Sequence, residues 1–492
     1  MMYFFKRILA TITILFFLGN PIYAQLTVTS KKEIELDAKD CKPSVVSVGI
    51  NGVVLLTEDH DKNLENNKQV LLEILDNRLA NKAKITLTVP HKASLVQHKS
   101  TENELFLVYS NLSKEQLYAF KIDLRDMTLQ NEIYYALPQI RYYESAVIED
   151  KLFLAGVKGK KGILVQIDFG ENKSKITHII QENVPAFIQH LDVIDGELCA
   201  SIKSSDSRDH NLYYRIINKS SNLVKGGMIK APKSMRILEG KLTKANNGKL
   251  SFIGTYANKK SVNPIGIFHT ELNQNASFIN FSDIPESAGL SLVEKKNKAK
   301  QESKFYLKIN DLNYANGTYF ALFELYDIVD DNKVNINENS LKLNNDSFLK
   351  MWVVNDLNYH DYNIHIFQKR MQDVAAYQFK GAYTLKLKNG KADLVNLEMN
   401  TNFTHKSFGN LISNSDKEGQ LQVIDKFNGD MRKLNIQGGH LYHYNSLMDR
   451  DGNHLNTPIT NTYFWKKDQY LFASVTQKEN GKLAVTFYKV KS

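Results

Sequence analysis

A short motif, in which a turn residue and one further residue precede an apolar strand, recurs along the chain at nearly even spacing. Two successive copies are Asp150-Lys-Leu152 and Gly196-Glu-Leu198. The steps between copies run from 46 to 59 residues, about the length that four short strands and their turns require. Imperfect repetition at this period is typical of a β-propeller. The apolar residues that mark the nine copies are Val54, Leu105, Leu152, Leu198, Leu250, Phe305, Ile364, Leu421 and Tyr470.

The residues between these marks favour short strands. Segments such as 117–124, 163–168 and 483–488 alternate apolar and polar residues and are rich in β-branched and aromatic types, as half-buried strands are. Asn-Gly and Asp-Gly pairs separate many of them, as turns between strands require. Only 69–79 and 369–377 resemble short helices.

Two consecutive units are regular enough for each strand to be assigned. In each, an inner strand is followed by three more strands joined by short turns. The predicted strands of the third unit are 142–148, 151–157, 162–168 and 175–180, and those of the fourth are 187–193, 197–202, 212–217 and 223–228.

The two ends of the chain predict how such a ring would close. The segment 483–490 resembles the third strand of its unit, and 26–36 resembles a fourth strand without a unit. Pairing them completes the last blade and removes an open sheet edge. The strands predict an all-β fold, a single β-propeller over 25–492. Nine copies mark the chain, but 330–400 is irregular and one copy there is expected to be false, so we predict seven or eight four-stranded blades. Two stacked β-sandwich domains are the competing architecture, but the middle of the sequence lacks the Pro-, Gly- or Ser-rich linker they would need.

The first 24 residues predict export. Lys6 and Arg7 precede an apolar run from Ile8 to Leu18, and the segment ends on the small residue Ala24. This is the three-part pattern of a secretory signal peptide over 1–24. The run is shorter than the ~20 residues of a spanning helix, although an uncleaved membrane anchor is the alternative. No Cys follows the cleavage site closely, so we expect a periplasmic or secreted protein that is not a lipoprotein and has no transmembrane segment after cleavage.

Composition and charge exclude several classes of protein. The chain has 492 residues, 42% hydrophobic and 24% charged, which is unlike a disordered, collagen-like or polytopic membrane protein. Without Lys6 and Arg7 the 63 basic residues fall to 61 against 53 acidic ones, a net charge of +8. This excess does not predict nucleic-acid binding but is compatible with anionic glycans. Cys41 and Cys199 are compatible with one disulfide after export or with two free thiols, and we expect a monomer.

The loops between the second and third strands of units three to five are rich in basic residues. In a propeller these loops lie on one face, so we expect their tips to be neighbours on a common rim. A positive patch of this kind suits carboxylate or sulfate groups, and Tyr256 could stack on a sugar ring beside it. The alternative is that these are ordinary solvated hairpin tips. The candidate ligand-binding residues are Lys158, Lys160, Lys161, Lys203, Arg208, Tyr256, Lys259 and Lys260.

A second pattern is a candidate catalytic group in unit four. His190 lies in a predicted inner strand, and His210 precedes Tyr214 and Arg215 on the basic loop and the strand after it. Histidine, tyrosine and arginine can act as base, acid and carboxylate neutraliser. Over about 30 residues the combination resembles propeller-type polysaccharide lyases, which implies action on uronate-containing glycans. The Trp-rich context of those enzymes is absent, and two ordinary histidines of a β-rich protein are the alternative.

Metal-binding patterns are incomplete. His440, His443 and His454 could share a metal only if a turn brought the first two together, because residues three apart on a strand face opposite ways. Calcium is the cofactor that two acidic stretches would suit, but each lacks the distal Glu of a calcium loop, and we otherwise expect no cofactor. These stretches are Asp449, Asp451 and Asn453, and Asp327, Asp330, Asp331 and Asn332.

The period and strand order resemble those of secreted bacterial β-propellers with degenerate WD40-like or BNR-like repeats. No clean Trp-Asp pair is present, so the resemblance stays at the superfamily level. It implies a binding or scaffold protein that engages a protein partner or an anionic glycan through one face. A glycan-active enzyme, either a lyase or a hydrolase, and a structural part of the cell envelope are the alternatives, because the fold alone does not set the function.

Overall fold

A computed structural model describes most of the chain after its first 25 residues. Within the longer ranges, short gaps lie at 65, 112–113, 138–139, 159–160, 179–185, 205, 207, 221, 246–247, 262–263, 273–276, 316 and 390. The ranges described are 26–36, 42–280, 305–329, 376–397, 404–405, 411–415, 420–425, 431–435, 440–444, 447–448, 461–466, 469–478 and 482–491.

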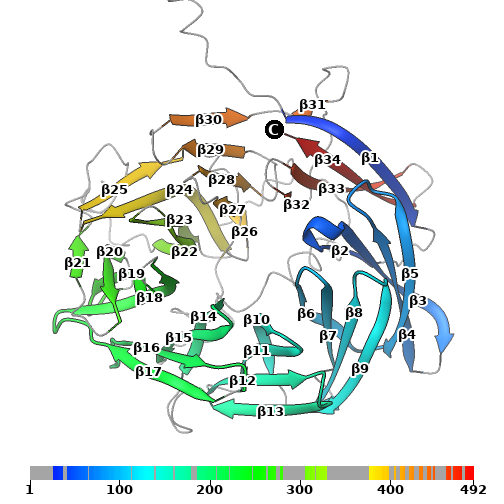
Figure 1. Ribbon diagram of the computed structural model, residues 1–492, viewed down its shortest axis with the longest axis horizontal. Helices are drawn as coiled ribbons and strands as arrows, with labels where there is room; N and C mark the ends of the chain where they lie inside the picture. Colours follow the sequence, from blue (N-terminus) through cyan, green and yellow to red (C-terminus); the bar gives the residue numbers. More distant parts are fainter. Residues whose placement is uncertain are drawn as a thin grey trace, which may run out of the picture.

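Antiparallel sheets of four strands account for nearly all of the described residues, and Figure 1 shows them arranged around a common centre. The expectation of an all-β chain built from four-stranded units is therefore confirmed. The first two complete sheets are β2 (Lys42–Ser47), β3 (Val53–Leu64), β4 (Asn67–Leu75) and β5 (Asn81–Pro90), and β6 (Ser94–Ser100), β7 (Glu104–Asn111), β8 (Gln116–Asp123) and β9 (Thr128–Ala136).

Two further units agree closely with the strands expected for units three and four. They share a single parallel pairing, Lys161 with Ala186, and are otherwise separate four-stranded sheets. Gly162 is required there because a Cβ on it would lie 2.5 Å from the carbonyl oxygen of Ala186. The strands are β10 (Arg141–Ile148), β11 (Lys151–Lys158), β12 (Lys161–Asp168) and β13 (Lys173–His178), and β14 (Ala186–Ile194), β15 (Glu197–Ser204), β16 (Leu212–Ile217) and β17 (Leu223–Ile229).

The later sheets repeat the same order. One contains β18 (Met235–Lys244), β19 (Leu250–Asn258), β20 (Pro264–Glu271) and β21 (Ser277–Asn280). The next contains β22 (Phe305–Ala315), β23 (Thr318–Val329), β24 (Ala376–Lys388) and β25 (Lys391–Asn396), with β26 (Thr404–His405) beside β24. A third contains β27 (Leu411–Ser415), β28 (Gln420–Asp425), β29 (Met431–Asn435) and β30 (His440–Tyr444).

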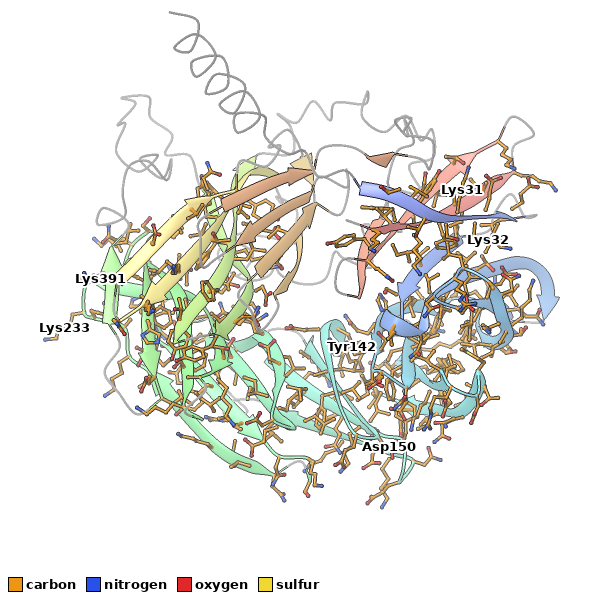
Figure 2. All side chains as sticks on the ribbon, turned by 45° about the horizontal axis from the view of Figure 1, so that its top comes forward. Lys31, Lys32, Tyr142, Asp150, Lys233 and Lys391 are labelled. Carbon is orange, nitrogen blue, oxygen red and sulfur yellow. The ribbon has the colours of Figure 1, made fainter. Side chains whose placement is uncertain are left out.

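The two ends of the described chain meet in one sheet. Strand β1 (Leu26–Leu36) pairs antiparallel with β34 (Leu483–Lys491), as Leu36 with Leu483 and Thr27 with Lys491. Lys478 adds an ion pair to Glu33 at 2.7 Å. Figure 2 shows Lys31 and Lys32 of β1 across the molecule from Lys233 and Lys391. The remaining strands of this sheet are β31 (Leu447–Met448), β32 (Asn461–Lys466) and β33 (Gln469–Gln477).

The core consists of apolar layers between neighbouring sheets. One layer joins β14 and β15 to β10–β12, with Phe153 and Phe187 fully buried in it. The next joins β16 to β18–β20 and contains Leu212, Phe252 and Phe268. Another layer packs Phe487 of β34 against Val53 of β3, so the terminal sheet is held by its neighbour as well as by strand pairing. Each buried Leu or Phe contributes about 1.5–3 kcal/mol to stability.

A β-bulge recurs in the innermost strands. In the described part of the chain, β6, β10, β14, β18 and β22 each contain one register shift, and Figure 1 shows these strands facing the centre of the ring. A bulge adds one residue and turns the side chains that follow it. The residues that follow the five bulges are Gln97, Glu144, His190, Glu239 and Asp311.

Two expectations differ from the structure. The segment 69–79 lies largely in β4, because its apolar residues fill the layer between two sheets. Phe305 begins an innermost strand, and the second strand of its sheet is β23. Of the two alternatives for the cysteines, the structure has Cys199 as a buried free thiol, and burial raises its pKa to about 12. Ile364 and Cys41 lie outside the described residues. No helix in the described ranges has the length and apolar character that crossing a membrane requires.

Cysteine cross-linking tests the pairing of the two chain ends. Glu33→Cys with Thr486→Cys, in a protein carrying Cys41→Ser and Cys199→Ala, places the new thiols at partner positions. We expect a disulfide to form on oxidation and to stabilise the protein by about 2–4 kcal/mol, because it constrains the unfolded chain. Urea unfolding of the oxidised and reduced forms measures the difference.

The matched control is Glu33→Cys with Ala484→Cys, since Ala484 pairs with Glu35 instead. Equal cross-linking of both pairs, or of neither, would contradict the register.

Candidate functional site

Lys203, near the end of β15, is buried, although its position next to a loop predicted a solvated side chain. It is 3% exposed. Its ammonium donates to the carbonyl oxygens of Asn211 at 2.6 Å and Asp209 at 3.5 Å, which ties down the loop between β15 and β16. None of the described carboxylates forms an ion pair with it. Burial, and next the charge of Arg236, lower the pKa of Lys203 to about 7.

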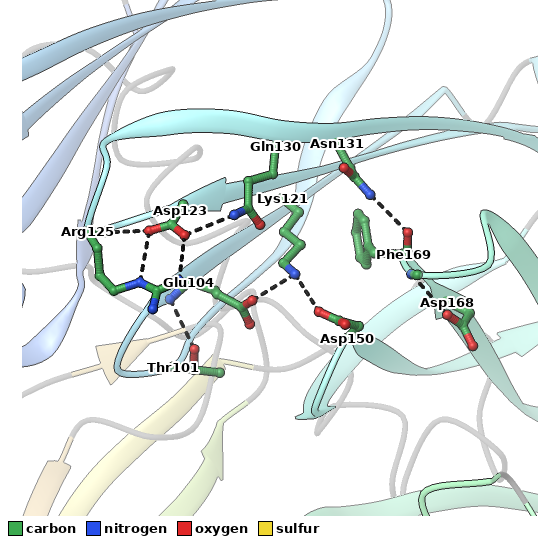
Figure 3. A network of polar contacts seen from close by, with 11 residues as sticks. Thr101, Glu104, Lys121, Asp123, Arg125, Gln130, Asn131, Asp150, Asp168 and Phe169 are labelled. Carbon is green, nitrogen blue, oxygen red and sulfur yellow. Dashed lines mark hydrogen bonds and ion pairs between the residues drawn. The ribbon is translucent and has the colours of Figure 1, made fainter.

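Another buried lysine, in contrast, is paired with carboxylates. Lys121 on β8 forms ion pairs with Glu104 at 2.7 Å and with Asp150, which lies in the turn of the neighbouring unit (Figure 3). Burial alone would lower its pKa, but the hydrogen bonds to Asp150 and Glu104 raise it. Figure 3 also shows Asn131 donating to the carbonyl oxygen of Phe169 at 2.9 Å across the same two sheets. Lys121 is compensated by two carboxylates, and Lys203 is not.

Arg236, at the start of β18, is the second buried cation beside Lys203. It is 9% exposed, its Nε is buried without a hydrogen-bond partner, and burial lowers its pKa. The backbone brings it to the loop: the N–H of Ile237 donates to the carbonyl oxygen of His210 at 2.9 Å. The N–H of Ala231 donates to Asn211 Oδ1 at 3.0 Å. The inner strand of one sheet is thus fixed against the loop of the preceding sheet.

Two more basic residues complete the cluster, which we call the basic junction: Lys203, His210, Arg236 and Lys259. His210 is half-buried, and its Nδ1 has no hydrogen-bond partner. Burial, and then the charges of Arg236, Lys259 and Lys203, lower the pKa of His210. Lys259, in the turn after β19, is exposed, and its N–H donates to the carbonyl oxygen of Ser234 at 2.9 Å.

The acidic residues of the loop are already engaged. Asp209 accepts hydrogen bonds from the Tyr213 hydroxyl at 2.8 Å and from the Asn211 N–H at 3.1 Å. Asp206 pairs with Arg208 at 3.0 Å on the outer part of the loop. Asp209 raises the pKa of Lys203 and of His210, but burial and the neighbouring basic groups outweigh it. The described carboxylates therefore compensate the basic junction only in part, and an anion would supply the rest.

His190 lies in a separate polar belt along the innermost strands, formed by the residues that follow the bulges. Its Nε2 lies 2.7 Å from Oε1 of Glu239 on β18. The other oxygen of Glu239 accepts from the N–H of Ile309 on β22 at 3.3 Å. Ser145 of β10 donates to Gln97 of β6 at 3.2 Å. These contacts link consecutive sheets.

Charged groups beside His190 extend this belt. Lys241 of β18 lies 3.5 Å from Asp192 of β14 and donates to the carbonyl oxygen of Asn310 at 3.4 Å. Burial raises the pKa of Glu144, although His190 nearby acts in the opposite direction. Burial and these pairings fit a structural role in joining the inner strands.

The residues expected to accompany His190 in catalysis do not converge on it. Tyr214 is buried against Phe252, with ring centroids 5.8 Å apart. Arg215, the next residue on β16, donates to the carbonyl oxygen of Tyr214 at 3.1 Å. Neighbouring residues on a strand face opposite ways, so this tyrosine and arginine cannot act on one group together. Tyr256 is 1% exposed, so its ring cannot stack on a sugar.

The other expected ligand-binding residues are partly described. Lys158, Arg208, Lys259 and Lys260 are exposed. Lys161 starts β12, with its side chain outside the described residues, and Lys160 lies outside them altogether.

Most of the expected metal ligands also lie outside the described residues. His440 and His443 both lie on β30, so no turn separates them within this described strand. Asp327 lies on β23, with its side chain outside the described part. The described residues contain no group of three or more His, Cys, Asp or Glu that could hold a metal. The remaining candidates outside the description are His454, Asp330, Asp331, Asn332, Asp449, Asp451 and Asn453.

Arg236 is the member of the basic junction that the repeat pattern did not single out. Once the strand register is known, a spacing is evident at its position: a basic residue lies three positions before the acidic residue that follows the bulge of an innermost strand. The spacing occurs as Arg236 with Glu239 and as Lys308 with Asp311, and each pair spans a register shift. The same spacing occurs in β10, as Arg141 with Glu144.

Comparisons with known proteins return only distant structural likeness. No protein-family model and no curated protein matches the chain. The WD40 domain of Toxoplasma gondii coronin is 9% identical, with 94% of this chain and 87% of that chain covered and a TM-score of 0.38.

Two other solved structures are similarly distant. The WD40 domain of SCAP from fission yeast is 9% identical over 94% and 95% of the two chains, with a TM-score of 0.39. A prolyl endopeptidase is 11% identical with a TM-score of 0.39, and this chain, covered over 93%, spans about half of it, 53%. Likeness at this level carries no argument about activity or partners.

The pH dependence of stability tests the state of Lys203. Its pKa is about 7 in the folded protein and 10.5 ordinarily, so between these values unfolding takes up a proton and stability rises with pH. Lys203→Met removes this proton uptake. We expect the stability of the wild type, relative to the variant, to increase between pH 7 and 9 by up to about 1.4 kcal/mol per pH unit. Urea unfolding at several pH values measures it.

Lys121→Met is the control, because the raised pKa of Lys121 leaves it charged in both states over this range. Its stability loss should stay constant from pH 7 to 9. Parallel pH curves for the wild type and Lys203→Met would contradict the assignment.

Proposed function

We propose that the protein is an exported binding protein built as an eight-bladed β-propeller, whose last blade is completed by β1. The basic junction and the exposed lysines beside it engage an anionic ligand, and the ligand that best suits them is an acidic glycan. The single observation that carries the proposal is Arg236, which is buried without a described counter-ion next to Lys203, a buried lysine without a described ion pair whose pKa is about 7.

Physical cost favours a binding role over a purely structural one. Burying an unpaired charge costs several kcal/mol unless other groups stabilise it. Elsewhere in the described chain, the buried ammonium of Lys68 is paired with Glu58, and that of Lys121 with two carboxylates. The basic junction differs, because its buried basic residues lack such ion pairs and lie next to the exposed Lys259. A cluster of this kind is typical of a site that binds an anionic ligand.

The blade count and the exported location are parts of the same proposal. Eight four-stranded units are supported by the strand pairings, in which β10–β13 and β14–β17 count as two blades. Export is supported by the signal-peptide pattern of 1–24. A monomer acting outside the cytoplasm, with no nucleic-acid partner, agrees with the modest net charge of the mature chain.

Charge reversal at the exposed edge of the junction tests the proposal. Lys259→Glu with Lys260→Glu replaces two exposed cations and leaves the buried ones in place. We expect retention on a column of sulfated or uronate-rich polysaccharide to fall, with affinity reduced at least about tenfold at low salt, because exposed charges act through long-range attraction.

Lys92→Glu with Lys114→Glu makes the same change of charge in the loops after β5 and β7, across the ring from β19 (Figure 1). It should keep most of the affinity. Equal losses in the two double variants would show that only net charge matters. No retention of the wild type on acidic polysaccharides would contradict a glycan ligand, and retention on acidic polypeptides alone would point to a protein partner.

A further inference from the structure

The geometry of the basic junction points to one specific ligand group, and this inference rests on the proposed function. We infer that Arg236 and His210, backed by Lys203 and Lys259, form a subsite for a single tetrahedral oxyanion. A sulfate ester and a phosphate monoester share this chemistry. The subsite lies where the loop between β15 and β16 meets the start of β18.

Arg236 supplies the directional contact. A guanidinium offers hydrogen-bond donors in a fixed plane, which matches two oxygens of one oxyanion. The Nε of Arg236 is buried and has no acceptor among the described residues. A group with two negative oxygens in this plane would satisfy the donor and neutralise the buried charge at once.

His210 supplies the second unpartnered atom. Its Nδ1 is buried without a partner, and the carbonyl oxygen of the same residue is fixed by the N–H of Ile237, the residue after Arg236. The histidine and the arginine are thus held in one place by the backbone. His210 is also half-buried, so part of its side chain meets solvent.

Donors from two different elements favour a tetrahedral oxyanion over a carboxylate. Arg236, Lys203, His210 and Lys259 are close enough for each of the last three to be coupled to another member. The carboxylate of Asp209 acts on Lys203 and His210, but it also accepts hydrogen bonds from Tyr213 and Asn211. The two oxygens of a carboxylate lie in one plane, whereas the oxygens of a sulfate or phosphate group point in several directions and can meet donors from both the loop and β18.

Titration calorimetry with inorganic sulfate tests the subsite at constant ionic strength in chloride. We expect the wild type to bind sulfate and inorganic phosphate more tightly than acetate. Arg236→Met should weaken sulfate binding about 10- to 100-fold, since it removes a charge-assisted hydrogen bond. Arg236→Lys, which keeps the charge but not the planar donors, should fall between the two. Arg208→Met, on the same loop but at a residue paired with Asp206, should bind as the wild type does.

Urea unfolding without added oxyanion separates a binding arginine from a structural one. Removing an uncompensated buried charge should leave the stability of Arg236→Met equal to or above that of the wild type. A clear loss of stability would identify Arg236 as structural and overturn the inference.

The other outcomes are equally decisive. Sulfate binding that is absent in the wild type, unchanged by Arg236→Met, or no tighter than acetate binding would overturn the subsite. If acidic polysaccharide is still retained in that case, the proposed function stands without it. If sulfate binds through Arg236 but no polysaccharide is retained, the subsite stands and the glycan proposal fails. Comparing sulfated sugars with phosphorylated ones then identifies the source of the group.

Discussion

Packing between neighbouring sheets is the constraint on which the rest of this structure depends. A four-stranded sheet with apolar residues on both faces is not stable alone. In the described residues, buried apolar layers join neighbouring sheets from the terminal sheet through β2–β5 to β22–β25. The buried layers around Phe187 and Phe252 are examples. This stacking brings the inner strands close together, and it places the loop after β15 directly against the start of β18.

Charge is handled differently in two regions that this packing creates. Along the inner strands, acids and bases pair across sheets, as His190 with Glu239 and Lys241 with Asp192. At the basic junction the backbone contacts are equally well made, but the cations lack carboxylate partners in the described chain. The first arrangement holds sheets together without needing a ligand. At the basic junction, the surrounding packing and backbone contacts hold the basic residues in place despite the electrostatic cost. Binding sites commonly hold unfavourable charges in this way.

Strand positions could be predicted from the sequence, and side-chain burial could not. Period-two patterns and turn pairs located β10–β17 nearly to the residue, because both are local properties. The segment 69–79 was misassigned because a run buried on both faces has no clear period. Lys203 and Tyr256 sit beside loops, but contacts from other strands bury them. Arg236 comes from a neighbouring sheet, which the repeat pattern did not reveal. Its spacing to Glu239 across a bulge becomes evident only once the strand register is known.

A crystal structure of the full chain grown with selenate would test the central claim most directly, because selenate mimics sulfate and its selenium can be located by anomalous scattering. The account predicts an anomalous peak between the loop after β15 and the start of β18 that places selenate oxygens within hydrogen-bond distance of Arg236 Nε and His210 Nδ1. A structure in which Arg236 is paired with a carboxylate of the chain, with no selenate beside it, would contradict the account.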